Sequence, residues 1–94
     1  MIREDGPRLA LEGPLTLATV AGLVEEGRSL VASADRLLDL AAVTQVDSAA
    51  LALLLSWVRA ARSAGRQLTI VHAPASLVSL AALYDVDTIL PLGR

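Results

Sequence analysis

Residues 38–51, LDLAAVTQVDSAAL, lead from a predicted buried strand through a tight turn into a predicted helix. The strand segment 35–43 is mostly apolar with Asp39 inside it, a composition typical of strands that are buried on both faces. Asp47 and Ser48 are residue types that bond the free N–H groups at a helix start, and the apolar residues after them have helical spacing. This segment therefore predicts a strand, a turn and a helix in direct succession.

The rest of the chain continues the alternation of strands and helices. Gly13-Pro14 should end the first strand, Thr16 should cap the first helix, and Gly65 should stop the second helix. The order predicts a single α/β domain over residues 1–94, with a small, mainly parallel sheet and helices packed on it. Strands are predicted at 8–12, 37–40, 67–72 and, as an edge strand, 88–92, and helices at 16–27 or 16–31, 48–64 and 74–84.

The composition excludes several classes of function. A net charge of −2, one Trp, one Tyr and no Lys give neither the basic stripe nor the stacking platform that nucleic-acid binding requires. The absence of Cys and Lys removes thiolate, disulfide and Schiff-base chemistry, and the sequence contains no phosphate-binding P-loop motif. We therefore expect the protein to bind no nucleic acid, metal or cofactor.

The sequence also lacks the features of a chain that inserts into a membrane. Its first residues contain no apolar run of a signal peptide, and no segment reaches roughly 18 consecutive apolar residues. The lack of Cys fits a reducing compartment. We therefore expect a cytoplasmic protein that reaches a membrane only through a partner.

Two catalytic arrangements can be drawn from the polar residues, and simpler interpretations compete with both. His72 is the only histidine, so a triad would combine Ser48, His72 and an aspartate, but isolated polar residues rarely form such a site. Asp39 and Asp47 could form an acid–base pair, yet Asp47 suits a helix cap and Asp39 suits hydrogen bonds to nearby backbone donors. We therefore expect no enzyme.

Ser48 itself has two open interpretations. Its hydroxyl can cap the helix, which would contribute about 1 kcal/mol to stability. It can also be a recognition point or a phosphorylation site, because the helix dipole would favour a phosphate there. The added charge would repel an acidic partner surface and would lie close to Asp47, so one serine could both cap a helix and regulate binding.

The helix predicted at 48–64 has a wider apolar surface than one contact with a sheet needs. A helix that faces a core usually needs an apolar arc of somewhat over 100°. Leu53 and Trp57 lie outside the main apolar stripe and are candidates for an outward-facing docking surface. The alternative is that the last predicted helix covers them. An exposed apolar face could also form a homodimer when the protein is isolated from its partner.

Several of these segments resemble the signature of STAS domains, the fold of bacterial anti-sigma factor antagonists. The resemblance covers nearly the whole chain and implies the STAS fold. In the antagonist branch, the serine that matches Ser48 is phosphorylated by an anti-sigma factor kinase, which implies the same role for Ser48. The resemblance rests on Leu38-Asp39-Leu40, Val43, Val46-Asp47-Ser48, Leu51 and the strand entry at 65–70.

The MlaB branch of the family is the more similar one. Residues 51–55, 60–65 and 80–86, which read LALLL, AARSAG and LAALYDV, resemble MlaB-type subunits. These subunits bind the ATPase of the Mla phospholipid ABC transporter in the cytoplasm, and the transporter supports outer-membrane lipid asymmetry. The resemblance implies a non-enzymatic accessory subunit that binds and regulates or stabilises that ATPase. The candidate docking residues are Asp47, Ser48, Leu53 and Trp57, with Asp39 in a supporting role.

One departure from the family pattern bears on phosphorylation. Many members have glycine one or two places after the serine or threonine, where this chain has Ala49 and Ala50. Their methyl groups would crowd a close approach of another backbone, which disfavours a kinase and leaves protein docking open. An anti-sigma factor antagonist that is phosphorylated at Ser48 is the alternative function.

Overall fold

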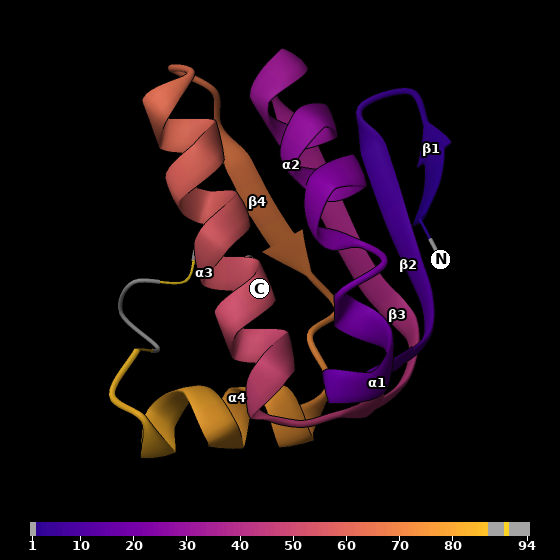
Figure 1. Cartoon of the computed structure of the whole chain (residues 1–94), viewed down its shortest axis with the longest axis vertical. Helices are drawn as coiled ribbons and strands as arrows, with labels where there is room; N and C mark the ends of the chain where they lie inside the picture. The colour runs from indigo at the N-terminus through magenta and orange to yellow at the C-terminus, as the bar shows by residue number, and fades with distance from the viewer. Residues whose placement is uncertain (1, 87–89, 91–94) are drawn as a thin grey trace.

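The structure of this chain is a computed structural model that describes residues 2–86 and residue 90 (Figure 1). Strands and helices alternate after an initial hairpin, and the predicted α/β class is confirmed. The elements are, in order, β1 (Ile2–Asp5), β2 (Arg8–Leu15), α1 (Leu17–Val20), α2 (Val24–Ser33), β3 (Arg36–Val46), α3 (Ser48–Ser63), β4 (Leu68–Val71) and α4 (Ala75–Leu83).

The described strands form one sheet in the order β1-β2-β3-β4. β3 is parallel to both β2 and β4, and β1 pairs antiparallel with β2, so the predicted mainly parallel sheet is confirmed. The sequence does not predict β1, because its residues IRED include a single apolar side chain and no alternating pattern. Gly6, at φ 60°, lies in the turn that reverses the chain between β1 and β2.

One face of the sheet is covered by α2 and α3, which run side by side in front of it (Figure 1). Leu38 and Leu40 of β3 are buried in the core on this side. Asp39 points to the opposite face, because side chains alternate along a strand. The prediction of a strand buried on both faces is wrong beyond Leu40, since residues 41–42 are exposed.

The segment between β2 and β3 differs from its prediction in two ways. β2 continues through Gly13-Pro14 to Leu15, and shifts of register against β3 accommodate these residues. Thr16 is the N-cap of α1, as predicted, but the single helix expected after it is divided into α1 and α2. Gly27 lies inside α2 instead of ending a helix.

The C-terminal part of the chain follows its prediction more closely. Gly65 has φ 71°, and its N–H donates to the carbonyl of Arg62 over 3.0 Å. The N–H of Arg66 donates to the carbonyl of Ala61 over 2.8 Å, which completes a Schellman cap and ends α3 as predicted. β4 and α4 lie near their predicted positions. The edge strand predicted at 88–92 lies almost wholly outside the described residues.

α4 lies across the end of the molecule at which the parallel strands finish and α3 begins (Figure 1). The loops that follow β2 and β3 therefore lie at this end, together with the whole of α4. Within the described part of the chain, no helix combines the length and the hydropathy needed to cross a membrane. The same residues contain no group of three or more His, Cys, Asp or Glu side chains that could hold a metal ion.

Candidate functional site

Asp47 lies between β3 and α3, and its carboxylate is hydrogen-bonded to both α3 and α1. It is the N-cap of α3, and its Oδ1 accepts a hydrogen bond from the N–H of Ala49 over 2.9 Å. Its Oδ2 accepts a hydrogen bond from the N–H of Leu17 at the start of α1 over 3.0 Å. One carboxylate thus caps α3 and fixes α1 beside it.

Ser48 is the first residue of α3 and is exposed. The interpretation of its hydroxyl as the helix cap is wrong, because Asp47 already occupies the capping position and bonds the free N–H of Ala49. The Ser48 hydroxyl has no hydrogen-bond partner among the described residues. It is therefore available to an external group at the positive end of the dipole of α3.

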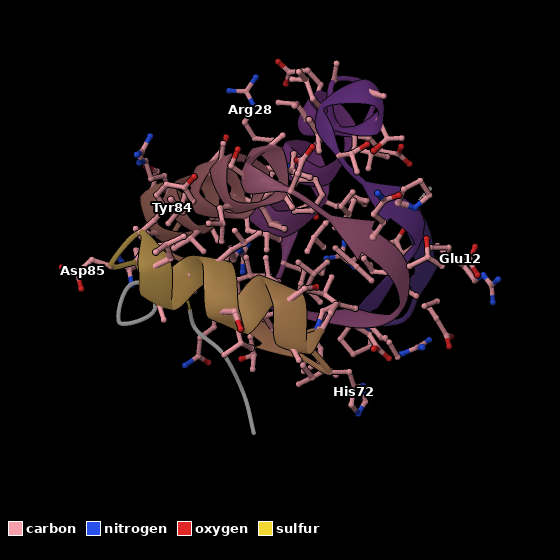
Figure 2. All side chains as sticks on the ribbon, turned by 90° about the horizontal axis from the view of Figure 1, so that it is seen from below. Glu12, Arg28, His72, Tyr84 and Asp85 are labelled. Atoms are coloured by element: carbon pink, nitrogen blue, oxygen red, sulfur yellow. The ribbon has the colours of Figure 1, made fainter. Side chains whose placement is uncertain are left out.

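A small hollow of about 210 Å³ lies beside Ser48. Its walls are mainly apolar and come from α3 and from the residues that follow α4. Tyr84 is 55% exposed and lies at the far end of α4 from His72 (Figure 2). We call the hollow, together with the exposed Leu17 beside Asp47, the Ser48 surface. Its residues are Leu17, Ser48, Leu51, Ala52, Leu55, Tyr84 and Val86.

Leu53 and Trp57 do not form an outward-facing surface, and this prediction is wrong. Their side chains are 3% and 0% exposed. α2 covers Trp57, whose Nε1–H donates to the carbonyl of Val24 over 3.1 Å. The wide apolar arc of α3 is therefore used by the sheet on one side and by α2 on another. This burial also removes the homodimer interface that an exposed Leu53 and Trp57 would have formed.

Asp39 is buried on the face of the sheet opposite α2 and α3, where its carboxylate is fully engaged. Oδ2 accepts from Nε of Arg8 over 2.9 Å, and Oδ1 accepts from the N–H of Ala41 over 2.9 Å. Nδ1 of His72 lies 2.9 Å from Oδ1. The hydrogen bonds from His72, Ala41 and Arg8 lower the pKa of Asp39 from 3.8 to about 2, against the opposing effect of burial.

Neither catalytic arrangement is assembled. Asp39 pairs with Ala10 of β2, and Val46, at the end of β3, pairs with Leu15. The strand from Ala10 to Leu15 spans roughly 17 Å, so Asp39 lies about this far from the start of α3. Asp39 and Asp47 therefore cannot act on one substrate group as an acid and a base. The same separation keeps Ser48 away from the Asp39–His72 pair, so the triad is not formed either.

Comparison with protein families identifies the domain. The model of the MlaB-type STAS domain matches residues 2–91. This chain belongs to the MlaB-type STAS family. The STAS domain shares its fold with a Thermotoga maritima protein assigned to the anti-sigma factor antagonists, at a TM-score of 0.72 and 15% identity, over 98% of this chain and 83% of the other. The anti-sigma factor antagonist SpoIIAA in its unphosphorylated form gives a TM-score of 0.69 and 10% identity, over 88% and 81% of the two chains. A comparison with curated proteins finds no match.

The Ser48 surface of this STAS domain includes two residues that the sequence interpretation missed. Leu17 is 78% exposed and Tyr84 is 55% exposed. Leu17 directly follows the predicted cap Thr16, and Tyr84 lies at the end of the last predicted helix. Neither sequence position reveals that Tyr84 lines the same hollow as Ser48, or that the backbone of Leu17 is bonded to Asp47. The position of Leu17 depends on the tertiary hydrogen bond to Asp47, and the position of Tyr84 depends on how α4 lies across the end of the sheet.

Proposed function

We propose that this STAS domain is a non-enzymatic accessory subunit that binds the ATPase of a Mla-type phospholipid ABC transporter. The Ser48 surface is the docking site, and binding regulates or stabilises the ATPase. The observation that carries the proposal is an exposed hydroxyl without a partner beside a 210 Å³ apolar hollow. The MlaB-type family match supports the choice of partner. The protein would then be cytoplasmic and would reach the inner membrane through the ATPase.

The chemistry of the Ser48 surface suits a protein partner. Apolar side chains at the centre of an interface provide most of the binding energy, and aromatic residues such as Tyr84 are frequent among them. A hydrogen bond to the Ser48 hydroxyl would fix the orientation of the partner. A phosphate on Ser48 would add negative charge next to Asp47 and would weaken binding to an acidic or apolar partner surface.

An anti-sigma factor antagonist regulated by phosphorylation at Ser48 is the second candidate. The exposed Ser48 hydroxyl and the two antagonist neighbours favour it. In this alternative, an anti-sigma factor kinase would occupy the Ser48 surface. The two candidates therefore share a docking site and differ in the partner.

Co-purification of the tagged protein from its native cells tests the proposal. We expect recovery of an ABC ATPase, reduced about tenfold or more by Tyr84→Ser or Ser48→Glu. Val78→Ser is the matched control, because Val78 is 43% exposed on α4 but does not line the hollow. Recovery of an anti-sigma factor kinase in place of the ATPase would refute the transporter proposal and support the alternative.

A further inference from the structure

The link between β4 and α4 is short and contains one residue with an unusual backbone. It consists of His72, Ala73 and Pro74. His72 has φ 57°, in the left-handed region that residues other than glycine seldom adopt. Pro74 has a fixed φ, at −60°, and is the N-cap of α4. Because so few residues form the link, the backbone of His72 largely sets the direction in which α4 leaves the end of β4.

A hydrogen bond to the sheet holds His72 in this conformation. Its Nδ1 lies 2.9 Å from Oδ1 of Asp39, which belongs to β3. The pKa of Asp39 is lowered to about 2, so its carboxylate is ionised near neutral pH and only accepts hydrogen bonds. Nδ1 of His72 therefore carries a proton and donates to Asp39. Unusual backbone conformations persist where surrounding contacts hold them, and this bond is such a contact.

α4 has few other ties to the rest of the protein. Its N-cap forms no side-chain hydrogen bond. In the part of the chain that the structure describes, no side chain of residues 75–83 forms a hydrogen bond or ion pair with another element. Its fully buried side chains are Leu77 and Ala81, and alanine buries little apolar surface. Among the described residues, the bond between His72 and Asp39 is therefore the polar contact nearest to α4 that fixes it to the sheet.

α4 connects this bond to the Ser48 surface. Figure 2 shows His72 at one end of the helix and Tyr84 at the other. Tyr84 and Val86 line the apolar hollow beside Ser48. α4 is roughly 13 Å long, so a turn of about 10° at the His72 end would move the Tyr84 end by about 2 Å. Such a displacement is enough to break close contacts between apolar side chains.

We infer that the hydrogen bond from His72 to Asp39 holds α4 in place and thereby shapes the Ser48 surface. His72 and Asp39 are then positioning residues, which act on docking through the location of Tyr84 and not through contact with the partner. The position of α4 concerns this chain alone, whereas its consequence for docking rests on the function proposed above. The two are therefore measured separately.

Three substitutions at His72 separate the role of its backbone from that of its side chain. His72→Asn keeps both, because Asn tolerates a positive φ and its Nδ2 donor is as many bonds from the backbone as Nδ1 of histidine. His72→Gly keeps the backbone conformation but removes the donor. His72→Leu removes the donor and also disfavours the left-handed backbone. Arg28→Gln is the control, because it breaks an ion pair on α2, on the opposite side of the molecule from α4 (Figure 2).

Residual dipolar couplings measure the orientation of α4 relative to α3 in the folded protein. We expect His72→Gly and His72→Leu to change it by more than about 10°, the turn that moves the Tyr84 end by about 2 Å. The methyl resonances of Leu51 and Leu55 should shift as well, because both residues line the hollow with the Tyr84 ring. His72→Asn and Arg28→Gln should leave the orientation and the resonances as in the wild type. A loss of stability alone would not reorient α4 in the molecules that remain folded.

Co-purification of the same variants tests the consequence for docking. Recovery of the partner should fall about fivefold or more in His72→Gly and His72→Leu and stay near the wild-type level in His72→Asn. An unchanged orientation of α4 in His72→Gly and His72→Leu would overturn the inference, as would a His72→Asn variant that behaves like His72→Gly. A reoriented α4 with undiminished recovery would overturn the positioning role. Recovery of an anti-sigma factor kinase that falls in His72→Gly would refute the proposed partner and still support the positioning role.

Discussion

A side chain at Gly27 could not coexist with the indole of Trp57. A Cβ atom built on Gly27 would lie 2.0 Å from the Cζ2 atom of Trp57. Trp57 also donates its Nε1–H to the carbonyl of Val24, one turn earlier in α2. The absence of a side chain at one residue and the presence of a large ring at the other therefore fix how α2 packs on α3.

Gly27→Ala should destabilise the protein. Helix propensity alone would favour alanine by about 1 kcal/mol at a position inside a helix. The clash with Trp57 should outweigh this gain and cost about 1–3 kcal/mol, as overpacked cores do. Gly22→Ala is the control, since its Cβ would only meet the carbonyl oxygen of Thr19 at 3.8 Å. Urea unfolding measures both, and a Gly27→Ala variant more stable than the wild type would contradict the packing described.

Trp57→Phe should reduce stability and leave partner binding unchanged. The substitution removes the Nε1–H donor and leaves the carbonyl of Val24 without this hydrogen bond, at a cost of about 1–3 kcal/mol. Because Trp57 is buried, the folded variant should retain its surface. Unfolding curves and co-purification measure the two properties separately. A variant that is stable but has lost partner recovery would show that Trp57 acts in docking after all.

Much of the fold could be predicted from local patterns, whereas the residues of the candidate docking surface could not. The Asp47-Ser48 helix start and the Gly65 stop depend on residues that lie close together in the sequence, so local rules find them. The exposure of Trp57 depends on whether Gly27, thirty residues earlier, leaves space for its ring. An apolar residue on a wide helix face can be buried by a second helix or can bind a partner. Only the packing of α2 distinguishes the two.

The stability of the protein should fall as the pH is lowered from about 4 towards 2. The pKa of Asp39 is about 2 in the folded protein against an ordinary value of 3.8, first because of the hydrogen bond with His72. A lowered folded-state pKa stabilises the fold above the unfolded value, and this contribution disappears as the pH falls through the folded value. The difference corresponds to at most about 2 kcal/mol. Asp39→Asn should remove this part of the pH dependence, as measured by urea unfolding between pH 2 and pH 6.

His72→Ala provides a finer test of the same cluster. It keeps the carboxylate of Asp39 but removes the largest cause of its lowered pKa. The acid-induced loss of stability should then begin at the same pH, which the unfolded-state pKa sets, but should end at a higher pH and be smaller in total. Arg8 and the N–H of Ala41 would still bond the carboxylate, so the variant should retain part of the effect. An unchanged titration of Asp39 in an NMR experiment would show that His72 does not control this pKa.

Asp47→Ala should destabilise the protein far more than Ser48→Ala, although the two residues are neighbours. Asp47→Ala removes the cap bond to Ala49 and the bond to Leu17, and should cost about 1–2 kcal/mol. Ser48→Ala removes an exposed hydroxyl that bonds nothing in the described chain, and alanine has the higher helix propensity, so the change should be within about 0.5 kcal/mol of zero or stabilising. Thermal unfolding checks both variants. A large loss in Ser48→Ala would mean that the hydroxyl stabilises the helix start, and it would then be less available to a partner.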